Sequence, residues 1–290
     1  MTPRRHRSHV RSQPDDPAVP PCRIMGIVNV TPDSFSDGGR YLAHAAAIAH
    51  GTEMWQQGAA AIDVGGESTR PGALRVPEHI ELERVLPVVR GLAGAGVTVS
   101  IDTMRARVAA KAVDAGASMI NDVSGGLADP AMATTVGQLG TPYVAMHWRG
   151  HSANMQHRAV YAAARHDVIT ELRERIEALL AAGVRGDQLI VDPGIGFAKT
   201  SGQSWEILAA VHELGTLGYP ILIGASRKSL FKELDLDQPQ PNRQRDLDAA
   251  TAALTAILAP LVAWVRVHDV RANVVAAQVA CRLEQDRPDV

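Results

Sequence analysis

Short hydrophobic runs alternate with longer amphipathic segments from about residue 24 to residue 285. Each run is almost continuously apolar, which is typical of parallel strands that are covered on both faces. The eight runs predict strands at residues 24–30, 60–64, 97–101, 118–121, 142–146, 188–191, 220–223 and 263–267. Because strand and helix patterns alternate, the sequence predicts an α/β fold with a parallel sheet.

The segments between the runs carry the spacing of amphipathic helices, with predicted buried positions at i, i+3, i+4 and i+7. Three such stripes are Ala45, Ile48, Ala49 and Thr52; Leu82, Val85, Leu86 and Val89; and Val168, Leu172, Ile176, Leu179 and Leu180. Gly183 follows the third stripe at the position of a helix C-cap. Pro260 is expected to end a further helix at residue 259, because proline cannot donate to the helical ladder.

Eight strands alternating with helices favour a closed (β/α)8 TIM barrel over an open doubly wound sheet, which has a similar pattern. The 290 residues suit one barrel domain, since such barrels run to roughly 250 residues. We therefore predict a single barrel domain over residues 23–290. Residues 1–22 contain four Arg, five Pro and almost no large apolar side chain. We predict a disordered tail there, because burial of so little apolar surface cannot offset chain entropy.

Polar or glycine-containing clusters follow nearly every predicted strand at its C-terminal end. Along the chain they include Asn29, Asp63, Asp102, Asn121, His147, Asp192, Gly224 and Arg266. In a TIM barrel these strand ends share one face, where the active site is built. The sequence therefore predicts that residues far apart along the chain meet at one barrel mouth.

Three of these residues have the groups that would match the edge of a flat heterocycle. Asp102, Asn121 and Asp192 supply carboxylate and amide atoms that can pair with ring donors and acceptors. Helix N-capping is the alternative role for any one of them. Three at strand ends are harder to explain in that way, so a heterocycle site is the preferred interpretation.

Positive charge gathers around the same rim. Arg70, Lys228, Arg266 and His268 would suit phosphate oxygens, with ordinary ion pairing to nearby acids as the alternative. Asn29 could bind a hard cation such as Mg2+ through its amide oxygen, since Mg2+ fills most of its shell from water and phosphate. The sequence thus predicts a phosphate-bearing ligand beside the heterocycle.

The overall charge is nearly balanced, with 29 Lys and Arg against 31 Asp and Glu and a formal net charge of -2. This balance gives no reason to expect a nucleic-acid or membrane partner. No apolar run approaches the ~20 residues of a membrane span, and a secretory signal is not expected. Cys22 and Cys281 have no motif spacing and are expected to be free thiols. We therefore predict a cytoplasmic protein.

Seven of these segments, in the same order, resemble the signature motifs of the dihydropteroate synthases, which are pterin-binding enzymes. They are residues 25–39 (MGIVNVTPDSFSDGG), 63–72 (DVGGESTRPG), 100–103 (SIDT), 120–126 (INDVSGG), 192–197 (DPGIGF), 224–229 (GASRKS) and 266–270 (RVHDV). The resemblance covers about residues 23–285. Pro260 departs from it, because the family usually has a glycine in that segment.

The resemblance implies a homodimeric (β/α)8 enzyme that joins (7,8-dihydropterin-6-yl)methyl diphosphate to p-aminobenzoate. Mg2+ assists, and the products are 7,8-dihydropteroate and pyrophosphate. Carried over by position, the pterin ligands are Asp102, Asn121, Asp192 and Lys228; the pyrophosphate ligands are Asn29 through Mg2+, Arg266 and His268; and the p-aminobenzoate neighbours are Thr69, Arg70, Pro71, Phe197 and Ser229. The residues expected to be catalytic are Asp102, Asp192, Lys228, Arg266 and His268. The resemblance also implies inhibition by sulfonamides and closure of the first two loops, at residues 29–40 and 67–75.

Two other functions remain open at this point. A pterin-binding methyltransferase on the same barrel would share the acids and amides, but it has less need of Lys228, Arg266 and His268 around a pyrophosphate. A non-catalytic paralogue that binds a pterin or a protein would be expected to have lost some charged loop residues, and all of those named are present. Release of pyrophosphate would separate these alternatives from the synthase.

Overall fold

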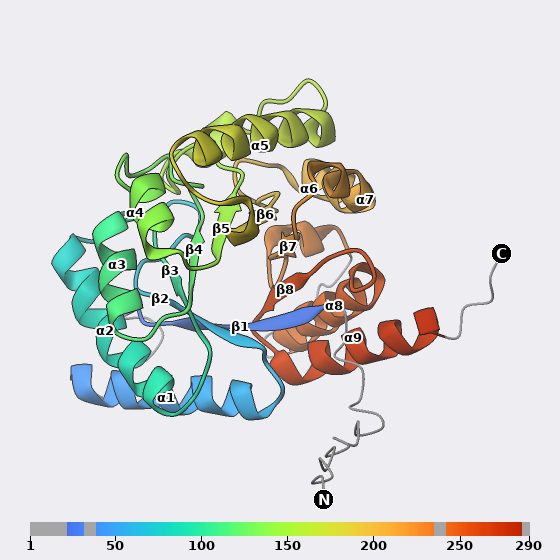
Figure 1. The fold of residues 1–290 in the computed structure, drawn as a ribbon. Coiled ribbons are helices and arrows are strands. Elements are labelled where there is room, and N and C mark those ends of the chain that lie inside the picture. Colours follow the sequence, from blue (N-terminus) through green and yellow to red (C-terminus); the bar gives the residue numbers. More distant parts are fainter. Residues whose placement is uncertain (1–21, 32–38, 235–241, 286–290) are drawn as a thin grey trace, which may run out of the picture.

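The computed structural model describes residues 22–31, 39–234 and 242–285 (Figure 1). Eight parallel strands form one sheet in the order β6-β5-β4-β3-β2-β1-β8-β7, and a parallel bridge from Val191 to Ile221 brings the two ends of this order together. The helices surround the strands, as Figure 1 shows. The predicted (β/α)8 TIM barrel is therefore confirmed, and the open doubly wound sheet is excluded.

The strands are β1 (Arg23–Asn29), β2 (Ala61–Gly65), β3 (Val99–Asp102), β4 (Met119–Asp122), β5 (Tyr143–Met146), β6 (Leu189–Asp192), β7 (Leu222–Ile223) and β8 (Trp264–Val267). Each overlaps its predicted run. The pairing register aligns Asn29 with Gly65, Gly65 with Asp102, and Asp102 with Asn121. The C-terminal ends of the first four strands therefore lie side by side at one end of the barrel.

The helices are α1 (Gly39–Gln56), α2 (Glu78–Gly94), α3 (Ala106–Asp114), α4 (Met132–Leu139), α5 (Ala164–Ala181), α6 (Ser201–Ala209), α7 (Val211–Leu214), α8 (Asn242–Leu258) and α9 (Val270–Gln285). The predicted stripe of α1 was partly wrong. Ile48 packs against the core as expected, but Ala45 and Ala49 are exposed, whereas Ala47 and Met54 are buried. Alanines lie on several sides of this helix, so its spacing could not identify the buried side. Leu180 of α5 is likewise exposed.

Two further predictions concern the N-terminal tail and the segment around Pro260. Residues 1–21 of the predicted tail lie outside the described residues, and Cys22, its last residue, is fully buried directly before β1. α8 ends at Leu258, one residue before the predicted end, and β8 begins at Trp264. Pro260 lies between them, in the turn that it was expected to produce.

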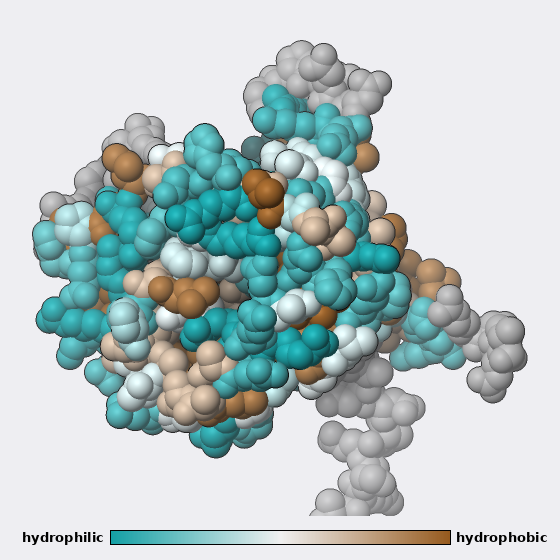
Figure 2. All heavy atoms as spheres, turned by 90° about the horizontal axis from the view of Figure 1, so that it is seen from above, coloured by the Kyte–Doolittle hydropathy of each residue, from teal (hydrophilic) through white to brown (hydrophobic). Residues whose placement is uncertain are grey.

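Apolar side chains fill the barrel interior near the N-terminal ends of the strands. This cluster, here called the floor, consists of Met25, Ala61, Met119, Val144, Ile190, Leu222 and Trp264. The floor shows that the barrel is a packed core rather than a pore, as is usual for this fold. The face drawn in Figure 2 is mainly hydrophilic, with apolar residues in small separate patches. Among the described residues, no helix is long and apolar enough to cross a membrane.

Candidate active site

On four of the strands, the side chain two residues after the floor residue is polar. Asp63, Asn121, Asp192 and Arg266 each lie two residues after a floor residue on the same strand. Side chains two residues apart on a strand point to the same face, so all four enter the barrel. The two aspartates and the asparagine are buried. Strand periodicity thus places a row of polar groups, here called the mouth row, directly over an apolar floor.

Arg266 is the centre of the acidic side of the mouth. Its Nε donates to Asp63 Oδ2 at 2.6 Å, and its Nη2 donates to Asp102 Oδ2 at 2.7 Å. Asn121 Nδ2 donates to the same Asp63 oxygen at 2.8 Å. Burial raises the pKa of Asp102, and Arg266 opposes that rise. One guanidinium group therefore pairs with two buried carboxylates, a geometry in which an ion pair persists inside a protein.

Lys228 lies on the loop that follows β7 and faces the end of β6. Its Nζ donates to Ile195 O at 2.6 Å and lies 4.6 Å from the centre of the Phe197 ring. Burial lowers the pKa of Lys228 to about 8, and Asp192 is the main group that opposes this decrease. Burial also raises the pKa of Asp192, against the effect of Lys228. The lysine and the aspartate therefore interact electrostatically beside the Phe197 ring.

His268 lies in a positively charged part of the mouth. Its Nδ1 is 3.0 Å from Ser226 Oγ, and its backbone N donates to the same oxygen at 3.3 Å. The cations around it are Arg227, Arg266, Arg70 and Lys228. Burial, followed by repulsion from these cations, lowers the pKa of His268 to about 3. The ring is therefore neutral near pH 7, and an anion placed here would meet several positive groups.

A small apolar cluster borders the polar groups. Met104, Val123 and Met146 form it, and the Phe197 side chain packs against it. The sequence analysis assigned these three residues no role in the site, because each is an apolar residue close to a polar strand end. It also gave no role to Asp63, although the two-residue period from Ala61 would have placed that carboxylate inside the barrel.

The other predicted site residues lie around the rim. Asn29 is at the end of β1, paired in register with Gly65. Arg70 and Pro71 are exposed, Thr69 is half-buried, and Ser229 is exposed on the loop after β7. These residues all follow C-terminal strand ends and therefore belong to the same end of the barrel.

Hydrogen bonds join the loop after β2 to the loop after β5. Gly72 N donates to Ser152 O at 2.8 Å, and Ser152 Oγ donates to Thr69 O at 3.1 Å. Gln156 Nε2, on the same loop after β5, donates to Gly196 O at 3.2 Å. The loop after β5 therefore connects two sides of the mouth. Residues 32–38 of the predicted first lid lie outside the described residues.

Comparison with known proteins agrees with this site. The model of the pterin binding enzyme family matches residues 25–268. A dihydropteroate synthase of Mycobacterium leprae (strain TN) is 48% identical over 268 residues, which span 90% of this chain and 93% of the relative. Two solved dihydropteroate synthase structures of Xanthomonas albilineans also match. The one with 4-aminobenzoic acid has a TM-score of 0.84 at 40% identity, covering 92% of this chain and 94% of that chain. The one with 7,8-dihydropteroate has a TM-score of 0.81 at 38% identity, covering 92% and 95%.

The chain therefore belongs to the pterin-binding enzyme family. Its fold and its mouth of acids and cations are those of a barrel enzyme in that family. Within the family its relatives place it among the dihydropteroate synthases, which are transferases of folate biosynthesis. The family membership and activity inferred from the seven motifs are confirmed. The methyltransferase and the non-catalytic paralogue receive no comparable support.

Proposed function

We propose that the protein condenses (7,8-dihydropterin-6-yl)methyl diphosphate with p-aminobenzoate at the barrel mouth, and that the residues predicted from the motifs perform the reaction. The observation that carries this proposal is the placement of Asp102, Asn121 and Asp192 next to Lys228, Arg266 and His268 at one end of the barrel. Acids and an amide suit the pterin edge, and the Arg266 cation with the neutral, hydrogen-bonding His268 ring suits its diphosphate. The complexes with 4-aminobenzoic acid and 7,8-dihydropteroate among similar structures support both ligands.

The pterin is proposed to bind over the floor, with its polar edge toward the acids. Asp192, Asn121 and Asp102 would accept from or donate to the ring, and Lys228 would complete the set. One of the two N–H donors of Asn121 Nδ2 is used by Asp63, so the other N–H and the amide oxygen are left for the ring. The apolar cluster of Met104, Val123 and Met146 would contact the flat face of the ring.

The diphosphate is proposed to leave toward Arg266 and His268. When the bond between the methylene carbon and the diphosphate oxygen breaks, negative charge grows on the leaving group. The preorganised Arg266 cation and a hydrogen bond from the neutral His268 ring stabilise this charge, an effect worth several kcal/mol. The positive charge left on the conjugated pterin would be stabilised by Asp102 or Asp192. These carboxylates are already buried in the mouth, so little reorganisation is required.

Mg2+ fits the residues at the end of β1. Within the described ranges, no three His, Cys, Asp or Glu side chains are grouped as metal ligands. A cation here would therefore be held by Asn29 together with diphosphate and water oxygens, a set that Mg2+ commonly uses. Bound in this way, it would supply further positive charge to the leaving group.

The p-aminobenzoate is proposed to lie between the loop after β2 and Phe197. Thr69, Arg70, Pro71 and Ser229 would surround it at the exposed rim, with Arg70 as the cation for its carboxylate. The neutral arylamine attacks the methylene carbon, a C–N bond forms, and the proton is lost afterwards to solvent. No strong general base is needed for this step. Sulfonamides, as mimics of p-aminobenzoate, are expected to compete for the same place.

Association into a homodimer is proposed on the outer face of α8 and α9. Val275, Val279 and Leu283 follow one another at intervals of four residues on α9 and are exposed, as is Ile257 of α8. An apolar stripe of this kind is typical of a buried interface. Light scattering of the full chain at micromolar concentration should give twice the chain mass. A cytoplasmic location without nucleic-acid partners remains a proposal from the sequence.

A pyrophosphate-release assay tests the reaction. Wild-type protein with pterin diphosphate and Mg2+ should release pyrophosphate steadily only when p-aminobenzoate is added. We expect Lys228→Ala to lose pterin diphosphate binding, since it removes a cation beside Asp192. Phe197→Ala should mainly raise the KM for p-aminobenzoate. Unchanged pterin affinity in the lysine variant, or no dihydropteroate from folded wild-type protein, would contradict the proposal.

A further inference from the structure

The loop between β6 and α6 has an unusual backbone. Gly194 and Gly196 have φ values of 69° and 78°, and Ala198, which has a Cβ atom, has a φ of 47°. A non-glycine residue in this region is disfavoured and persists only where the surrounding structure holds it. The loop begins at Asp192 and carries Phe197, so whatever holds this backbone also places two groups of the mouth.

Lys199 is the side chain that holds the loop. It is buried, and its Nζ donates to Gly194 O and to Phe197 O, each at 3.0 Å. A third contact joins Nζ to His147 Nδ1 at 3.0 Å. A lysine ammonium has three donors, so these three acceptors use all of them. Two of the three are backbone carbonyls of the loop itself, and the third lies at the end of β5.

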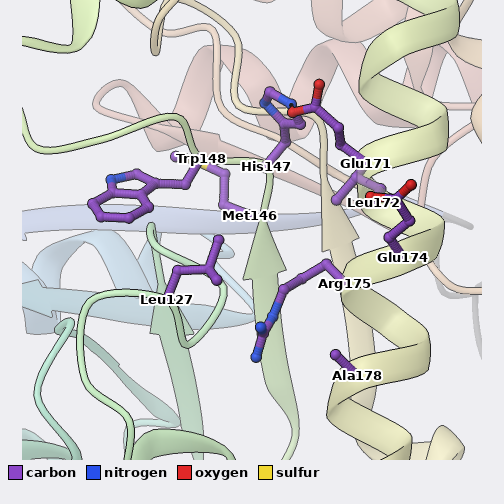
Figure 3. A pocket seen from close by; sticks show the side chains of 9 residues that line it. All are labelled: Leu127, Met146, His147, Trp148, Glu171, Leu172, Glu174, Arg175 and Ala178. Atoms are coloured by element: carbon purple, nitrogen blue, oxygen red, sulfur yellow. Dashed lines mark hydrogen bonds and ion pairs between the residues drawn. The ribbon is translucent and has the colours of Figure 1, made fainter.

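His147 is in turn oriented by α5. Its Nε2 lies 2.9 Å from Glu171 Oε2, and the two side chains face one another at one end of a pocket that is lined by residues of α5 and of the end of β5 (Figure 3). A carboxylate only accepts hydrogen bonds, so the ring proton is on Nε2 and Nδ1 is free to accept from Lys199. Arg149 Nε donates to the same Glu171 oxygen at 3.0 Å. Donation therefore runs from Lys199 through His147 to Glu171, which also accepts from Arg149.

Burial favours the neutral forms of Lys199 and His147, whereas hydrogen bonds keep Glu171 charged. Burial lowers the pKa of Lys199 to about 7 and that of His147 to about 4. The hydrogen bond from His147 is the main cause that lowers the pKa of Glu171 to about 2. A buried lysine is costly, and an apolar side chain would fill the same space at a lower cost. The carbonyls of Gly194 and Phe197 explain why a donor is present here.

We propose that Lys199 is a positioning residue for the transferase reaction: it ties the loop after β6 to the end of β5 and thereby fixes the Phe197 ring on the p-aminobenzoate side of the mouth. Lys199 acts through Phe197 and not by contact with a substrate. The inference rests on the proposed role of Phe197.

The test is a double-mutant cycle on the full-length protein with steady-state kinetics for both substrates. Lys199→Met keeps the length of the side chain and removes the donors, and Phe197→Ala removes the ring. Lys111→Met, at an exposed lysine of α3, is the matched control. Each variant of the pair should raise the KM for p-aminobenzoate about tenfold with a smaller change in the KM for pterin diphosphate, and the double variant should be no worse than Phe197→Ala alone, because residues that act through one group are not additive.

The outcomes separate this inference from the proposed function. If the two effects multiply in the double variant, Lys199 acts independently of Phe197 and the inference is wrong while the proposed site stands. If Phe197→Ala leaves the KM for p-aminobenzoate unchanged, the proposed role of Phe197 is wrong and the inference falls with it. Should Lys199→Met fail to fold, Lys199→Gln, which retains an amide donor, is expected to give a smaller rise of the same KM. An unchanged KM in that folded variant would also overturn the inference.

Discussion

The floor and the mouth row share four strands and differ in almost every physical respect. On β2, β4, β6 and β8 the floor residues Ala61, Met119, Ile190 and Trp264 are followed two positions later by Asp63, Asn121, Asp192 and Arg266. The two rows are therefore separated by about 7 Å along each strand. The first row consists of apolar side chains, and the second consists of charges and an amide.

This difference indicates that the floor contributes to the stability of the barrel and that the mouth row contributes to the reaction. Burial of the floor stabilises the fold, at about 25 cal/mol for each Å² of apolar surface removed from water. The mouth row carries the desolvation cost of several charges and depends on mutual pairing to offset it. A substitution in the floor should therefore change stability alone, whereas one in the mouth row should change stability and turnover together.

Arg266→Met should have the largest effect on both properties. It leaves the Asp63 and Asp102 carboxylates buried without their common cation, and loss of one partner of a buried ion pair costs about 3–5 kcal/mol. Turnover should fall by roughly 10² or more, because the leaving diphosphate loses a preorganised cation. Urea unfolding and pyrophosphate release measure the two effects.

The control for this substitution is Arg173→Met, at an exposed arginine of α5. The stability deficit of Arg266→Met should also be smaller at pH 5 than at pH 8, because unpaired buried carboxyls become protonated as the pH falls. Wild-type stability in the folded variant would show that the mouth row does not depend on this pairing.

Leu222→Ala should destabilise the protein without impairing the reaction. Leu222 is fully buried in the floor, and a leucine-to-alanine change in a core costs about 2–5 kcal/mol. At a temperature where the variant is folded, its kcat and KM values should match those of wild type. Leu180→Ala, at a leucine that is 39% exposed, serves as the control. A large loss of turnover in folded Leu222→Ala would mean that the two rows are not independent.

The sequence alone was sufficient for the strands and for much of the mouth. Eight apolar runs fixed the strands, and the residues after them fixed the face on which chemistry occurs, because parallel strands bring their C-terminal ends together. Asp102, Asn121, Asp192, Lys228, Arg266 and His268 were all identified in this way and lie at that face. Their individual roles in binding and catalysis came from the motif resemblance and remain proposals.

What the sequence could not provide were the side-chain contacts between strands. The pairing of Arg266 with Asp63 joins residues 203 positions apart, and nothing in the local pattern of either strand indicates it. Nothing in the sequence indicated a role for Lys199, for a related reason. A lysine after an apolar loop is usually solvated, and only the carbonyls of Gly194 and Phe197, turned inward by a left-handed backbone, make it a buried donor.

The smallest expected effect is a dependence of stability on pH. The floor contributes nothing to it, because no floor side chain ionises. His147 lies at the mouth end of β5, where burial and then Lys199 lower its pKa from 6.5 to about 4. The unfolded chain takes up this proton near pH 6.5 and the folded chain near pH 4. Stability from this histidine is therefore complete above pH 6.5 and decreases as the pH falls toward 4, by about 2 kcal/mol at pH 5.

His147→Gln removes that titration, so the gap in unfolding free energy between wild type and variant should narrow by about 2 kcal/mol from pH 7.5 to pH 5. His79→Gln, at an exposed histidine of α2, is the matched control and should show a constant gap. Urea titrations at both pH values give the comparison. A constant gap for His147→Gln as well would mean that this ring titrates normally, and the mouth end of β5 would then be as open to water as the outer surface of the barrel.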